Sequence, residues 1–123
     1  MADVNRRPGR QSVGETTHAH AHRSAPKRPS DESFVRAAAL FRAAGDVARL
    51  RLLHTLSQSE WCVSELAESE GTKLSTLSQQ LRLLYAERIV ERRREGKHIY
   101  YRLADEHVRE LVSTALVHAG ERR

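Results

Sequence analysis

Cysteine is nearly absent from this chain: Cys62 is the single cysteine in 123 residues. One thiol cannot build an intrachain disulfide framework, and it cannot supply the pairs or triads of thiolates that bind soft metals. Any metal chemistry must therefore rest mainly on histidine and carboxylate side chains.

Long hydrophobic runs are also missing. The longest run of apolar residues covers 37–41, far short of the roughly 18 residues that a membrane-spanning helix needs. The polar N-terminus also lacks the apolar core of a signal peptide. We therefore expect a cytoplasmic protein without a membrane partner and, at this length, a single folded domain.

Positive charge is in excess, with 21 Lys and Arg against 16 Asp and Glu, which favours a polyanionic partner. Residues 1–29 contain all three prolines, three histidines and few large apolar side chains. Such a segment cannot bury enough apolar surface to offset the entropy lost on ordering. We predict a disordered, basic, histidine-containing arm over residues 1–29 and a folded domain over residues 30–123.

Apolar residues recur at helical spacing in five segments of that domain. The pattern predicts helices over residues 30–44, 47–57, 63–70 and 75–88, and from 105 onward, with Asp46 and Ser75 as N-caps and Gly71 as a breaker. Between residues 89 and 103 the period drops to two around Gly96, which is typical of a β-hairpin. The predicted fold is mainly α with a β-hairpin wing.

Two helices joined by a short glycine-containing turn and followed by a basic hairpin predict a winged helix-turn-helix. In that fold the second helix enters the major groove and the wing touches flanking DNA, with polar side chains at base edges and cations at phosphates. The predicted DNA contacts are Lys73, Ser75, Thr76, Ser78, Gln79, Gln80, Arg82, Arg92, Arg93, Arg94, Lys97 and His98. A solvated helix face would carry similar charges, so the interpretation needs the fold and the charge together.

The last predicted helix carries Asp105 and His107 at its start and His118 and Glu121 at its end. The two histidines lie about 16 Å apart along the helix axis, too far for one ion with bonds of about 2 Å. If two copies of the helix pack antiparallel in a dimer, the first pair of one chain meets the second pair of the other. Each of the two resulting sites would hold two imidazoles and two carboxylates, a donor set that favours zinc, with cobalt or nickel as alternatives.

Three segments, residues 60–67 (EWCVSELA), 77–84 (LSQQLRLL) and 96–103 (GKHIYYRL), resemble the ArsR-SmtB family of metal-sensing winged-helix repressors. The resemblance runs from about Phe34 to the C-terminus. It implies a homodimer joined by the first and last helices, which binds operator DNA with an inverted repeat. It also implies repression of metal-efflux or sequestration genes that metal relieves. The D-x-H and H-x-x-E residues match the interhelical zinc site of the family's zinc sensors, whereas Ser78-Gln79 replaces the family's usual Ser-His pair.

The resemblance also implies a second type of metal site. Cys62 lies where thiolate-using members of the family begin such a site, which residues of the N-terminal arm complete. A mixed site would combine Cys62 and Glu65 with the alternating arm histidines His18, His20 and His22. The alternatives are a partly buried structural cysteine and an arm that binds metal loosely.

Three other classes of protein are possible alternatives. A hydrolytic zinc enzyme needs an open coordination position and a concave pocket, which a thin helical domain hardly offers. We therefore expect that the protein is not an enzyme and that it has no small organic substrate. A metal buffer or delivery protein would bind metal without operator DNA, and a thiol-redox repressor would need a second cysteine or a bond between subunits.

Overall fold

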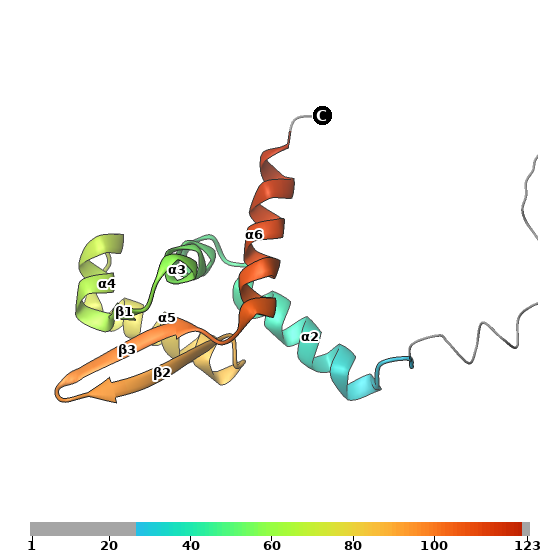
Figure 1. Cartoon of the computed structure of the whole chain (residues 1–123), viewed down its shortest axis with the longest axis horizontal. Helices are drawn as coiled ribbons and strands as arrows, with labels where there is room; N and C mark the ends of the chain where they lie inside the picture. Colours follow the sequence, from blue (N-terminus) through green and yellow to red (C-terminus); the bar gives the residue numbers. More distant parts are fainter. Residues whose placement is uncertain (1–26, 122–123) are drawn as a thin grey trace, which may run out of the picture. The chain divides into compact units, whose positions relative to one another are not determined.

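The computed structural model describes residues 27–121, and the predicted order of helices and hairpin is confirmed (Figure 1). Most of the predicted arm, including His18, His20 and His22, lies outside the described residues. The elements are α2 (Asp31–Ala44), α3 (Val47–Gln58), β1 (Trp61–Cys62), α4 (Val63–Glu70), α5 (Leu74–Ala86), β2 (Val90–Glu95), β3 (His98–Leu103) and α6 (Glu106–Gly120). Strand β1 was not predicted.

The helix-turn-helix consists of α4 and α5, joined at Gly71. Gly71 has a φ of 64°, and its backbone N–H bonds to the last turn of α4, so glycine ends this helix as predicted. The prediction that Ser75 caps α5 is wrong: Lys73 occupies the N-cap position, makes no side-chain cap, and leaves Ser75 inside the first turn. Helix α5 ends at Ala86, and Arg88 follows with a φ of 60°.

The wing is part of a three-stranded antiparallel sheet with strand order β1-β3-β2. Arg92 pairs with Tyr101, and Arg93 pairs with Tyr100. Paired residues point to the same face of a sheet and successive residues to opposite faces. The sheet therefore presents Arg92 and Tyr101 on the face that packs toward α5, and Arg93 and Tyr100 on the outer face.

The core is built from leucines of α3, α4 and α5 together with the base of the sheet. On α3 the apolar residues Val47, Leu50, Leu53 and Leu56 recur at three-residue intervals, but Val47 is 68% exposed while Leu52 is buried. A helix turns about 100° per residue, so each three-residue step leaves the stripe about 60° off its original face. Val47 and Leu56 therefore lie on opposite sides of α3.

The first and last helices leave large apolar side chains uncovered. Helix α2, described over its whole length, has no buried residue, and Phe34 and Phe41 are each more than half exposed. Helix α6 buries Val108 and Val112 but exposes Val117. In Figure 1 the hairpin tip lies at the left, and both helices lie to the right of it, away from the tip.

Candidate nucleic-acid interface and metal ligands

Helix α5 is held in the core by Leu77, Leu81 and Leu84, each with no exposed surface. At about 100° per residue, the side opposite these leucines carries Ser75, Gln79 and Arg82, all exposed. Of the other predicted readers on this helix, Thr76 is also exposed, whereas Ser78 and Gln80 are half-buried on its flanks. The outward face of α5 is therefore mainly polar and centred on Gln79, with the 47% exposed Leu83 beside it.

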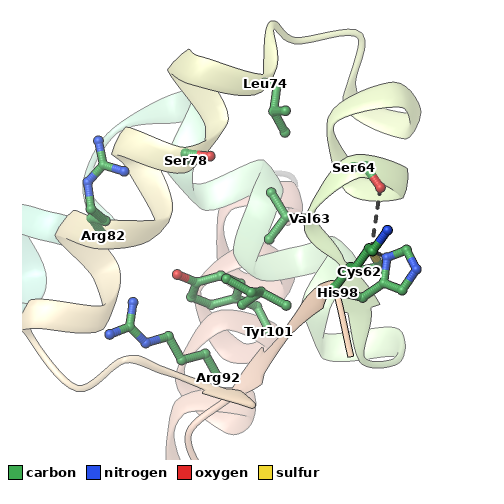
Figure 2. A pocket seen from close by; sticks show the side chains of 11 residues that line it. Cys62, Val63, Ser64, Leu74, Ser78, Arg82, Arg92, His98 and Tyr101 are labelled. Atoms are coloured by element: carbon green, nitrogen blue, oxygen red, sulfur yellow. Dashed lines mark hydrogen bonds between the residues drawn. The ribbon is translucent and has the colours of Figure 1, made fainter. Parts of the chain in front are cut away.

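A cavity of about 320 Å³ lies between α4, α5 and the wing. Figure 2 shows Arg82 and Arg92 at one end of it and Cys62, Ser64 and His98 at the other. Lys97 and Ser78 also line it. The structure thus brings together predicted cationic contacts from α5 and from the wing, and these cations form a positive surface beside the outward face of α5.

Tyr85 and Glu60 contact the predicted arginines, and sequence reasoning missed both. The Arg92 guanidinium lies over the Tyr85 ring, 4.0 Å from its centroid. Glu60 accepts hydrogen bonds from Arg93, and these hydrogen bonds hold the pKa of the Glu60 carboxyl below its ordinary value. Tyr85 is 41% exposed, because its ring covers the arginine rather than the core.

Cys62 is 5% exposed at the end of β1. Its Sγ lies 3.4 Å from Ser64 Oγ and 3.6 Å from His98 Nδ1. The hydrogen bond from Ser64 lowers the thiol's pKa, with a smaller contribution from His98, against burial, which raises it. The alternative metal site was predicted from Cys62, Glu65 and the arm histidines, and only Cys62 and Glu65 lie among the described residues. The structure shows that His98 is also a neighbour of the Cys62 thiol.

The four predicted metal ligands form two pairs at opposite ends of α6. His107 Nδ1 lies 3.8 Å from Asp105 Oδ1, and His118 Nδ1 lies 3.6 Å from Glu121 Oε1. Asp105 is also the N-cap, since its Oδ1 accepts from the Val108 N–H at 3.0 Å. Among residues 27–121 of one chain, no three His, Cys, Asp or Glu side chains are close enough to hold one ion. A single chain therefore holds the predicted ligands as two separate His–carboxylate pairs.

The model for the family "Bacterial regulatory protein, arsR family" matches residues 46–92, from the start of α3 into β2. A transcriptional repressor SmtB homolog of Synechocystis is 42% identical over 68% of this chain, which spans just under two thirds (64%) of that protein. A cadmium resistance regulatory protein CadC homolog of Staphylococcus aureus is 36% identical, with 87% of this chain and 91% of that protein covered.

A solved homodimeric winged helix-turn-helix domain from Mycobacterium bovis, described as a possible ArsR-family regulator, superposes with a TM-score of 0.69. Its sequence is 31% identical to this one, and the match covers 90% of this chain and 93% of the Mycobacterium bovis chain.

None of the helices in residues 27–121 is long and apolar enough to cross a membrane. The predicted fold and the expectation that the protein is no enzyme are confirmed. This chain belongs to the ArsR family of bacterial regulatory proteins and is a DNA-binding transcriptional regulator with a winged helix-turn-helix fold.

Proposed function

We propose that this protein is a zinc-responsive repressor, which binds operator DNA as a homodimer and releases it when zinc binds to α6, with cobalt and nickel as alternative ions. Its operator would be an inverted repeat and its genes those of metal efflux or sequestration. The observation that carries the proposal is the pair of His–carboxylate half-sites at the two ends of one exposed helix.

The uncovered apolar surface of α2 and α6 supports the homodimer. Phe34, Phe41 and Val117 are each more than half exposed, and exposed large apolar side chains of this kind favour a protein interface. A two-fold interface uses the same patch on both copies. An antiparallel arrangement of the two copies of α6 would bring Asp105 and His107 of each chain to His118 and Glu121 of the other.

The spacing within each half-site suits a shared metal ion. Two ligands of one zinc ion with bonds of about 2 Å lie about 3 to 4 Å apart, and the pairs are separated by 3.8 and 3.6 Å. Two neutral imidazoles and two carboxylates suit a borderline divalent cation and balance its charge. Cadmium and antimony, which appear in the names of two similar proteins, fit this thiolate-free set less well.

The position of α6 suggests how its ligands act on DNA binding. Strand β3 of the wing ends at Leu103, and Asp105 caps α6 two residues later. Arg109 of α6 also donates to the Ser57 carbonyl at the end of α3. Linking the two copies of α6 would therefore fix the relative placement of the two DNA-reading units. For zinc to release nearly all of the DNA, it must bind the dimer state that does not fit DNA more tightly than the DNA-binding state, by roughly 4 to 6 kcal/mol.

A second candidate is metal sensing through Cys62 in the same fold. It is favoured by the 3.6 Å separation between the Cys62 thiol and His98 Nδ1, which places a thiol and an imidazole side by side. Glu65 and the arm histidines His18, His20 and His22 would complete the site. A metal buffer or delivery protein would use the same ligands without releasing DNA.

The experiment that tests the proposal mixes two inactive variants. One carries Asp105→Ala and His107→Ala, and the other carries His118→Ala and Glu121→Ala. Each alone lacks one half of both sites and should bind no zinc at α6, whereas a mixed dimer regains one complete site. After subunit exchange the mixture should bind about one quarter of the wild-type zinc. A mixture that binds none, or single variants that bind as wild type, would contradict a site shared between chains.

A further inference from the structure

Arg93 lies at the centre of a run of three arginines on β2, and strand alternation separates it from its neighbours. Arg93 pairs with Tyr100, whereas Arg92 pairs with Tyr101 and Arg94 with Ile99. Successive residues of a strand point to opposite faces. Arg92 and Arg94 therefore share the face toward α5, and Arg93 lies on the other face of the wing.

Every nitrogen of the Arg93 guanidinium donates to a carboxylate. Nε lies 3.0 Å from Glu60 Oε2, Nη2 lies 2.8 Å from Glu60 Oε1, and Nη1 donates to Glu95. The guanidinium also lies over the Tyr100 ring, 4.5 Å from the centroid. Two parallel hydrogen bonds to one carboxylate form the geometrically most specific ion pair available to arginine.

The surroundings of Arg92 and Arg94 differ in charge. Within residues 27–121 neither guanidinium is paired with a carboxylate; Arg92 lies over Tyr85, and Arg94 makes a long 3.5 Å hydrogen bond to the Gly96 carbonyl. Their charges are available to a phosphate. The charge of Arg93 is already balanced by Glu60 and Glu95, so a phosphate would have to displace a bidentate carboxylate to reach it.

Glu60 connects Arg93 to a distant part of the chain. It directly precedes β1, which pairs with the central strand β3 through Trp61 and Cys62. Arg93 lies on β2, at the other edge of the same sheet. The Glu60–Arg93 pair therefore spans β3 and joins the two edge strands over the outer face of the wing.

We infer that Arg93 is a positioning residue that clamps the wing to the segment before β1 through Glu60, leaving phosphate contact to Arg92 and Arg94. The inference refines the proposed DNA interface and rests on it, because the clamp acts on how the wing is presented to DNA. It also revises our expectation that all three arginines contact DNA.

The test uses the sign of a charge change. Glu60→Gln removes one negative charge, so electrostatics alone predicts tighter binding to DNA. Loss of the clamp predicts weaker binding, by about twofold to tenfold for a dimer with two wings. Glu91→Gln is the matched control. Glu91 lies on the same strand and face as Arg93 but pairs with Arg102 instead. It should bind as wild type or slightly more tightly.

Binding is measured on a duplex that the wild-type protein selects from a random-sequence pool, over a series of salt concentrations. Arg94→Gln should reduce the slope of log K against log salt by about two units per dimer, one for each phosphate that the variant no longer neutralises. Arg93→Gln should weaken binding without this reduction. Combining it with Glu60→Gln should add nothing further, because both changes break one interaction.

Hydrogen exchange of the free protein gives a readout that does not depend on DNA. The amides of β2 should exchange faster in Glu60→Gln than in the Glu91→Gln control. Tighter binding by Glu60→Gln, a reduced salt slope in Arg93→Gln, or unchanged exchange would each overturn the clamp. A wild-type protein that selects no duplex would instead contradict the repressor proposal, and exchange would then decide the clamp alone.

Discussion

The guanidinium of Arg92 lies 4.0 Å from the centroid of the Tyr85 ring, which joins the wing to the last turn of α5. This contact fixes the position of a cationic strand relative to the helix whose outward face carries Gln79. The two elements that we propose to contact DNA are thus joined by a direct contact within one chain.

Replacing Tyr85 should loosen this coupling. Tyr85→Leu removes the aromatic face, and we expect operator affinity to fall by about twofold to fivefold per wing, the equivalent of one cation–ring interaction. Tyr85→Phe keeps the ring and should bind nearly as wild type. Equal affinities for the two variants in a fluorescence anisotropy titration would show that the ring does not orient the wing.

Gln79 and Arg94 should affect DNA binding in different ways. Gln79→Ala removes a side chain from the outward centre of α5 and should reduce discrimination between the selected duplex and a scrambled one, by roughly 1 to 3 kcal/mol for each base edge that the glutamine reads. Arg94→Gln should weaken binding to both duplexes alike. If Arg94→Gln altered base preference and Gln79→Ala did not, the assignment of helix and wing would be reversed.

Arg88 should be a site where glycine stabilises the protein. Its φ of 60° is left-handed, and its N–H bonds to the Tyr85 carbonyl, while the next N–H, of Ile89, bonds to Leu84. This is the usual glycine position after a helix, so Arg88→Gly should raise the free energy of unfolding by about 0.5 to 1 kcal/mol. Arg88→Ala, which keeps the steric conflict, should show no such gain in urea denaturation.

The stabilising effect of Glu60 should depend on pH. Its pKa is lowered in the folded protein, mainly by hydrogen bonds from Arg93. A lowered folded pKa stabilises the protein at pH values above the unfolded value of 4.5, and the effect is lost as pH falls through the folded pKa. Wild type should therefore be more stable than Glu60→Gln at pH 7, and the difference should shrink on acidification below about pH 4.5. A difference that stayed constant down to pH 3 would contradict the pairing.

The helices and the hairpin could be predicted because each has a local pattern in the sequence. Strand β1 could not be, since two residues have no periodicity and Trp61 and Cys62 become a strand by pairing with Tyr101 and Tyr100. The contact between Cys62 and His98 arises from the same long-range pairing. The pairing of Arg93 with Glu60 was hidden for this reason too, because the two residues are 33 positions apart in the sequence.

The division among the three wing arginines is partly visible in the sequence. The two-residue period of the hairpin already places Arg92 and Arg94 on one face and Arg93 on the other. Alternation alone therefore separates the run of arginines into two classes. It does not say which class lies toward α5, which required the contact between Arg92 and Tyr85 in the folded chain.

The most direct test of sensing at α6 is zinc-driven release of the selected duplex, measured by fluorescence anisotropy with wild type, His118→Ala and His54→Ala. His54 is an exposed histidine on α3 and serves as the matched control. We predict that zinc weakens DNA binding by wild type and His54→Ala about a thousandfold or more. His118→Ala should bind DNA as tightly as wild type and keep it when zinc is added. Release of DNA from His118→Ala at the wild-type zinc concentration would contradict sensing at α6.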